Sequence, residues 1–269
     1  MAGLVSKTVK SSYKSLLRVD DDSNGIDATI EAVTDGVGNK SCISISDDKL
    51  SVQPQDDNTT TTLQVNNTGG GACLTVDTTN GIVRAGLGAI RVHTQYAYFG
   101  VTSIDSANYA DDTHQAIPFN GNGHADLTYP PEFGSSADPA TTFTTSHGNG
   151  TKASDLVPCL WFVQDNITVD AVTAIIGADT ATGDSAARVH LESYTFNPGS
   201  TSALTNGETI AYSAADLAGA GDEQAYTQAL TVNTSNNDID SNQVILAFFR
   251  SDSINSDYSL NITVKYHLR

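Results

Sequence analysis

Pairs of aliphatic residues at alternate positions recur through the first third of the chain, and turn residues follow each pair. The tripeptide Leu-x-Val begins at positions 17, 50, 63 and 74, with Asp, Asn, Gly or Pro within the next few residues. Alternation with a period of two predicts β-strands, but such short strands bury too little surface to be stable alone. We therefore predict a β-repeat segment over residues 19–104, stabilised by stacked repeats or by pairing with identical chains.

The C-terminal part of the chain has longer strand patterns. Apolar and polar residues alternate throughout residues 258–268, as in a strand with one buried face, whereas residues 244–249 are continuously apolar, as in a central core strand. We predict a β-sandwich of jelly-roll type over residues 158–269, with a hint of a helical turn at residues 216–220. Its seven predicted strands lie at residues 159–163, 167–176, 188–196, 209–213, 226–232, 244–249 and 258–268.

Residues 105–157 lack a strand pattern. Four prolines and several stretches rich in Asn and Gly predict a loop-rich connector, and loops of this length are usually functional or span subunits. The aromatic residues of the connector are predicted to form small cores that pin the loops or pack across subunits. A face on which glycans stack is the alternative. These aromatic residues are Tyr109, Phe119, Tyr129, Phe133 and Phe143.

Composition agrees with an all-β fold. Only 16% of the residues are charged, whereas Ser, Thr, Asn and Asp, which favour turns over helix interiors, are abundant. The net charge of −18 argues against a nucleic-acid partner, because phosphate contacts need clustered Lys and Arg. No signal peptide is recognisable, and no apolar run is long enough to cross a bilayer, so no membrane partner is expected.

The charge is distributed unevenly. Residues 1–18 contain no acidic residue and carry +4, which leaves −22 for the rest of the chain. A basic arm on an acidic chain predicts electrostatic attachment to a partner, and a frayed terminus is the alternative. A short helical turn is expected at residues 11–17. The basic residues of the arm are Lys7, Lys10, Lys14 and Arg18.

One segment matches a metal-binding motif. Residues 20–31 fit the EF-hand calcium loop, which places oxygen ligands around a sharp glycine turn. The residues that follow contain Thr34, Gly36 and Gly38 and cannot form the exiting helix of that motif. An acidic hairpin turn is therefore the preferred interpretation, and a calcium site is the alternative. The matching positions are Asp20, Asp22, Asn24, Gly25 and Glu31.

No catalytic, cofactor-binding or metal-ligating residue is assigned. Hydrolase signatures such as Gly-x-Ser-x-Gly and His-Glu-x-x-His are absent from the sequence, so no enzymatic activity is expected. A glycosidase remains open, because its two carboxylates are recognised by geometry. His114, His124 and His147 lack zinc-site spacing and are expected to be solvated. Small buried thiols are expected at Cys42, Cys73 and Cys159.

Several stretches resemble exterior structural proteins of tailed bacteriophages. Residues 15–27 and 44–54 carry this resemblance, and Leu74-Thr-Val-Asp-Thr-Thr-Asn-Gly-Ile-Val83 is similar to the repeats of trimeric fibre shafts. Residues 189–194 and 262–268 are similar to the β-sandwich heads of such proteins. These motifs cover 47 of the 269 residues, about a sixth of the chain, and contain no catalytic residues.

The resemblance implies a non-enzymatic virion surface protein, assembled in the host cytoplasm and exposed on the particle exterior. We expect a homotrimeric capsid decoration (cement) or head-fibre protein. Its partners would be other copies of the chain and virion proteins such as the major capsid protein. The alternative is a tail fibre or adhesin that recognises host surface glycans.

Overall fold

A computed structural model describes residues 16–21, 23–87, 90–105, 107–120, 128–178, 187–215, 224–252 and 258–269. The chain divides into two compact units, Met1–Val92 (the N-terminal unit) and His93–Arg269 (the C-terminal unit). Strands account for 49% and helices for 3% of the structure, which confirms the predicted all-β fold. None of the helices in the described ranges is long and apolar enough to span a membrane.

Two four-stranded antiparallel sheets make up the N-terminal unit, with strand orders β1-β2-β3-β4 and β5-β6-β7-β8. Three of the four Leu-x-Val patterns lie in β4, β5 and β6, and the first overlaps β1, so the predicted short strands are confirmed. The strands are β1 (Arg18–Val19), β2 (Glu31–Thr34), β3 (Lys40–Ile45), β4 (Leu50–Val52), β5 (Leu63–Asn66), β6 (Ala72–Asp77), β7 (Ile82–Ala85) and β8 (Ile90–Arg91).

Side-chain hydrogen bonds shape the turns of this unit. Between β2 and β3, one carboxylate oxygen of Asp35 accepts hydrogen bonds from the backbone N–H groups of Val37, Gly38 and Asn39. Gly38 adopts a φ of +100°, a conformation that side chains with a Cβ rarely adopt. Local turn chemistry therefore sets the register of strands that have little core behind them.

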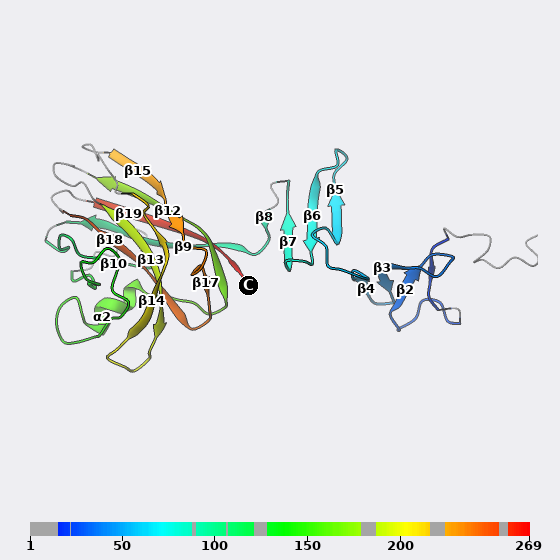
Figure 1. Ribbon diagram of the computed structural model, residues 1–269, viewed down its shortest axis with the longest axis horizontal. Helices are drawn as coiled ribbons and strands as arrows, with labels where there is room; N and C mark the ends of the chain where they lie inside the picture. Colours follow the sequence, from blue (N-terminus) through cyan, green and yellow to red (C-terminus); the bar gives the residue numbers. More distant parts are fainter. Residues whose placement is uncertain are drawn as a thin grey trace, which may run out of the picture. The chain divides into compact units, whose positions relative to one another are not determined.

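Two antiparallel sheets build the C-terminal unit (Figure 1). The five-stranded sheet has the order β15-β12-β19-β9, with β17 paired to β12, and the six-stranded sheet has the order β10-β18-β13-β14-β16, with β11 paired to β18. The strands are β9 (Thr94–Ile104), β10 (Gln115–Ile117), β11 (Trp161–Phe162), β12 (Ile167–Ala178), β13 (Arg188–Phe196), β14 (Leu204–Tyr212), β15 (Gln224–Ala229), β16 (Thr231–Val232), β17 (Asp238–Ile239), β18 (Gln243–Arg250) and β19 (Tyr258–Leu268).

A hydrophobic core joins the two sheets and confirms a sandwich-like architecture. Val189 and Leu191 of β13 belong to one buried cluster with Val172 of β12 and with Ile262 and Val264 of β19. Successive side chains of a strand point to opposite faces, so this core takes alternate residues from each strand. Burying both sheets in one cluster is the main stabilising contribution to this unit.

A second core covers the outer face of the six-stranded sheet. Leu246 and Phe248 of β18 pack there with Phe133 and Phe143, which come from the stretch predicted to be a loop-rich connector. Strand β18 is therefore buried on both faces, as the continuous apolar run at 244–249 predicts. The short helices α2 (Ala153–Leu156) and η1 (Val157–Cys159) contribute Leu156 and Cys159 to the same core.

The unit boundary differs from the one expected from sequence. The chain divides after Val92 rather than after residue 104, because β9 pairs along most of its length with β19. Residues 105–157 likewise fall within the C-terminal unit, and Phe133, Phe143 and Leu156 of this stretch pack on a sheet face. Their hydrophobic residues are spaced irregularly, so neither a strand period nor a helix period in the sequence predicts that they pack on a sheet.

Most strands predicted in the C-terminal unit are confirmed, with four local differences. Of the strand predicted at residues 159–163, only Trp161–Phe162 forms β11, because Val157–Cys159 forms the short helix η1 with a proline in its first turn. Strand β14 begins at Leu204 rather than residue 209, because its first residues include Asn206 and Gly207 and look like a turn. Residues 226–232 divide into β15 and β16 at Leu230, and the short strands β10 and β17 were not expected. The helical turn predicted at 216–220, and the one at 11–17 apart from residues 16 and 17, lie outside the described residues.

Candidate functional site

A groove of about 330 Å³ lies in the C-terminal unit, beside the first residues of β9 and β12 and the last residues of β19. Antiparallel pairing places these strand ends together, because Gln95 is opposite Tyr266 and Ile167 is opposite Leu268. Strand β11 and the loop after it complete the groove. The lining residues are Gln95, Phe119, Trp161, Phe162, Val163, Gln164, Asp165, Ile167, Tyr266 and Leu268.

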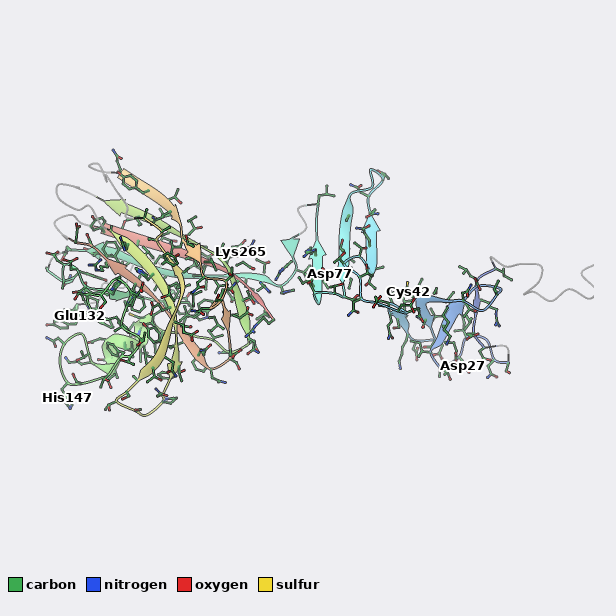
Figure 2. The ribbon with its side chains drawn as sticks, in the orientation of Figure 1. Asp27, Cys42, Asp77, Glu132, His147 and Lys265 are labelled. Carbon is green, nitrogen blue, oxygen red and sulfur yellow. The ribbon has the colours of Figure 1, made fainter. Side chains whose placement is uncertain are left out.

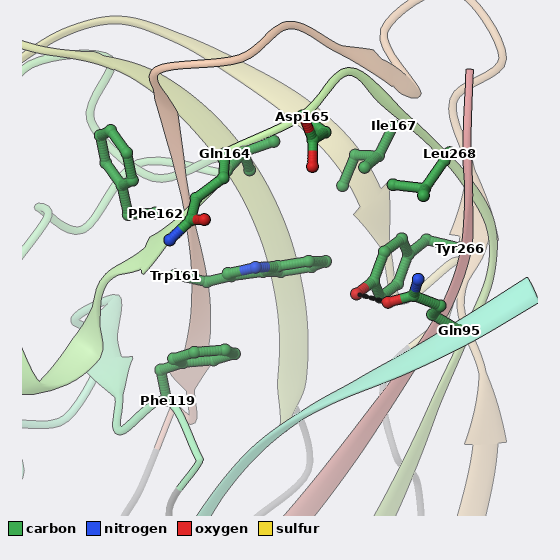
Figure 3. Close-up of a pocket in the computed structure, with 10 residues that line it drawn as sticks. Gln95, Phe119, Trp161, Phe162, Gln164, Asp165, Ile167, Tyr266 and Leu268 are labelled. Carbon is green, nitrogen blue, oxygen red and sulfur yellow. Dashed lines mark hydrogen bonds between the residues drawn. The ribbon is translucent and has the colours of Figure 1, made fainter. Parts of the chain in front are cut away.

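Aromatic rings form the base of this groove (Figure 3). The rings of Phe119 and Trp161 are stacked, with centroids 5.7 Å apart and planes inclined by 4°. Tyr266 packs against Trp161 at a centroid distance of 5.0 Å and an angle of 58°. Phe119 covers one face of the indole, and the opposite face borders the space beneath Gln164 and Asp165. Trp161 is 8% exposed, so this aromatic base is recessed.

Polar groups lie around the aromatic base. The Tyr266 hydroxyl donates a hydrogen bond of 2.9 Å to the side-chain carbonyl of Gln95, which leaves the amide N–H groups of Gln95 directed elsewhere. Gln164 and Asp165 are exposed, and their side chains make no hydrogen bond with other residues in the described ranges. The groove therefore combines flat apolar rings with free hydrogen-bonding groups, a combination typical of small-molecule sites.

A second concentration of chemistry is the buried polar network on the outer face of the six-stranded sheet. The rings of His114 and His190 meet edge to face with centroids 4.9 Å apart. The pKa of each histidine is lowered to about 4, chiefly by burial, and for His114 the proximity of His190 is the second cause. Asp138 lies 3.9 Å from the Nε2 atom of His190. Both imidazoles are therefore neutral at pH 7.

Glu192 is the buried acid of the same network. Its carboxylate accepts a hydrogen bond of 2.9 Å from the Thr209 hydroxyl, and the Tyr194 hydroxyl lies 2.9 Å from its other oxygen. Burial raises the Glu192 pKa to about 7, although these hydrogen bonds lower it. The Tyr194 hydroxyl also lies 2.9 Å from the Ala140 carbonyl oxygen. Since one hydroxyl proton serves one acceptor at a time, a protonated Glu192 can donate to Tyr194 while Tyr194 donates to Ala140.

The residues of the calcium-loop motif are not arranged as a ligand set in the part of it that is described. Asp21, which is not a motif position, accepts hydrogen bonds from the backbone N–H groups of Ser23 and Asn24, and Glu31 opens β2 opposite Ile45. Asp22 lies outside the described residues. Across the described ranges, no group of three or more His, Cys, Asp or Glu side chains is placed to hold a metal ion.

The histidines and cysteines differ in part from expectation. His114 is fully buried rather than solvated, because the chain around Gly134 folds over it and accepts its ring and backbone hydrogen bonds. His147 is exposed, as expected (Figure 2), and His124 lies outside the described residues. Cys159 is buried, but Cys42 and Cys73 are exposed, because their short sheets have little core behind them.

Most aromatic residues of the stretch 105–157 belong to hydrophobic cores, as the sequence analysis predicts. Phe133 stacks on Phe143 at a centroid distance of 4.7 Å and packs against the sheet. Tyr109 is buried in the core between the sheets, and Phe119 packs against that core. Tyr129 is 46% exposed, with the Lys152 ammonium 5.9 Å from its ring centroid.

No protein-family model matches the chain, and no curated protein matches it in sequence. The groove and the buried network are therefore interpreted from the residues that form them. Sequence reasoning assigned neither site. The signal for the groove was the single tryptophan, Trp161, followed by the polar pair Gln164 and Asp165.

Proposed function

We propose that the chain is a non-enzymatic, homotrimeric surface protein of a bacteriophage particle, either a capsid decoration (cement) protein or a head fibre. In this proposal the N-terminal arm and β-repeat segment attach to virion proteins such as the major capsid protein. The C-terminal unit faces outward from the particle. The resemblance of residues 15–27, 44–54 and 74–83 to exterior phage proteins supplies the virion context.

The observation that carries the oligomeric part is the exposure of apolar side chains on the N-terminal unit. Every residue of β5 is exposed, including Leu63 and Val65, and Leu50 of β4 is 70% exposed. Soluble monomers seldom leave strands with so little burial, and exposed apolar strands of this kind favour association with another chain. Contact between identical chains would bury these side chains.

Sedimentation of the full chain tests this proposal. We expect a trimer at micromolar concentration, and we expect Val65→Lys to shift it toward monomers, because a charge would be buried at the interface. Gln64→Lys is the matched control, since it adds the same charge to the neighbouring position, which points to the other face of β5. A stable monomer for the unmodified chain contradicts the proposal.

An adhesin that binds host surface glycans is the second candidate. The groove beside Trp161 favours it, because an aromatic base with free amide and carboxylate groups suits a sugar. Among the described residues that line the groove, Asp165 is the one acidic side chain. A glycosidase needs a pair of carboxylates, so the groove fits binding better than hydrolysis.

A further inference from the structure

We propose that the groove beside Trp161 binds a single ring of a neutral sugar. This inference deepens the second candidate function and rests on it for the source of the ligand, a cell-surface glycan. It does not depend on attachment of the chain to a particle.

The aromatic base suits the apolar side of a sugar ring. One face of a pyranose presents mainly C–H bonds, which pack favourably on the electron-rich face of an indole. Phe119 is stacked on the far side of Trp161 and holds the indole plane in place. Tyr266 stands at an angle of 58° to that plane and forms a side wall. The rings are therefore pre-arranged, so little side-chain entropy is lost on binding.

The polar rim suits hydroxyl groups. The Asp165 carboxylate points into the space above the indole (Figure 3), and an ionised carboxylate can only accept hydrogen bonds. The amides of Gln164 and Gln95 can donate as well as accept. Sugar hydroxyls do both, so they match this set of groups. A phosphate or sulfate would be repelled by Asp165 and by the net charge of −18 on the chain.

A quaternary ammonium ion is the competing ligand, because aromatic rings beside a carboxylate also attract cations. The quaternary head of such an ion offers no conventional hydrogen-bonding group and would leave the amides of Gln95 and Gln164 unused. The groove volume of about 330 Å³ lies at the low end of the range for ligand sites, roughly 300–1,000 Å³. Size and rim chemistry together favour one hydroxylated ring.

The single tryptophan of the chain makes the test direct, because the intrinsic tryptophan fluorescence reports on Trp161 and therefore on this groove. Methyl glycosides of glucose, galactose, mannose and N-acetylglucosamine are titrated into the full chain. Sorbitol serves as a polyol without a ring, and choline serves as the cation. We expect a saturable change in emission with at least one glycoside and none with sorbitol or choline.

Two exposed residues are changed to test the rim. Asp165→Asn and Gln164→Ala are each expected to weaken binding about tenfold, which corresponds to about 1.4 kcal/mol. Glu208→Gln is the matched control, because Glu208 is an exposed acid on β14 in the other sheet, and it should bind as the unmodified chain does. An unchanged emission maximum without sugar shows that each variant keeps the fold around Trp161.

The outcomes separate the inference from the functions on which it draws. Binding to a glycan array that Asp165→Asn and Gln164→Ala leave unchanged overturns the inference but keeps the adhesin. Absence of any glycan binding overturns both the sugar site and the adhesin. The virion-surface proposal is not affected, because it is tested separately by the oligomeric state. A response to choline alone assigns the groove to a cation and overturns the sugar assignment.

Discussion

The imidazole rings of His114 and His190 meet edge to face on the outer side of the six-stranded sheet, with centroids 4.9 Å apart. We call the loops that pack on this side, through Phe133 and Phe143, the loop cover. The Nε2 atom of His114 and the Nδ1 atom of His190 have no hydrogen-bond partner among the described residues. Both rings are buried, so a proton added to either one would be poorly solvated and close to the other. We therefore expect this pair to make the C-terminal unit sensitive to acid.

The stability of the protein is expected to fall as the pH falls from about 6.5 to about 4. The folded-state pKa of both histidines is about 4, against an ordinary value of 6.5. Between these values the unfolded chain binds more protons, so acid favours unfolding. Thermal melts from pH 7 to pH 4.5 measure the effect. His190→Gln should flatten the decline, whereas the exposed control His147→Gln should leave the slope unchanged.

Glu192 should act in the opposite direction. Its pKa is raised from 4.5 to about 7 in the folded state, so the folded protein binds more protons between these values and loses stability as the pH rises through them. The unfolding free energy of Glu192→Gln, measured relative to that of the unmodified protein, should therefore be about 1–3 kcal/mol higher at pH 8 than at pH 5. Denaturant melts at both pH values measure the gain. An equal gain in Glu208→Gln would contradict the assignment to this buried acid.

Phe133 is expected to be the main anchor of the loop cover. It stacks on Phe143 and contacts Phe248 of β18 at a centroid distance of 4.7 Å. Phe133→Ala should cost about 3–5 kcal/mol of unfolding free energy, because a fully buried ring leaves a cavity. Tyr129→Ala removes a half-exposed ring from the same segment and should change stability by less than about 0.5 kcal/mol. Similar losses in the two variants would show that the loops are not held by this core.

Calcium is expected to leave the melting temperature unchanged. Asp21 already serves as the acceptor of a local turn, so residues 20–31 are interpreted as an acidic turn. Melts with calcium and with a chelator measure the difference. A real site would stabilise the fold by about 2.7 kcal/mol at a hundredfold excess over its dissociation constant. A chelator-sensitive shift that disappears in Glu31→Gln would establish the calcium site.

Deletion of residues 1–18 is expected to leave folding and oligomerisation intact and to abolish incorporation into particles. In the full chain, Lys7, Lys10 and Lys14 would order against an acidic partner surface, whereas Arg18 already belongs to β1 and lies 3.5 Å from Asp20. Co-sedimentation with particles measures attachment. Neutralising the basic residues should weaken attachment most at low salt, because salt screens such contacts. Equal decoration by the truncated chain would show that the arm is a frayed end.

Local patterns determined much of the fold. The alternation from Tyr258 to Leu268 predicted β19 with its full length, and the apolar run at 244–249 predicted a strand buried on both faces. A strand repeats every two residues, so its buried face is visible in a short window of sequence. Turn chemistry is equally local, and the short strands of the N-terminal unit were predicted for that reason.

Tertiary structure decided the sites. His190 and Glu192 alternate with apolar residues on β13, a pattern that predicts a solvent-exposed face, yet both are buried in the structure. The loops that carry His114 and Asp138 lie against His190. The groove depends on strand order and on the packing of the two sheets, since Gln95 and Tyr266 lie on the paired strands β9 and β19, whereas Trp161 lies on β11 of the other sheet. A sequence window contains the period of each strand. It does not show which strand each one will pair with, because strand pairing depends on the free energy of the whole sandwich.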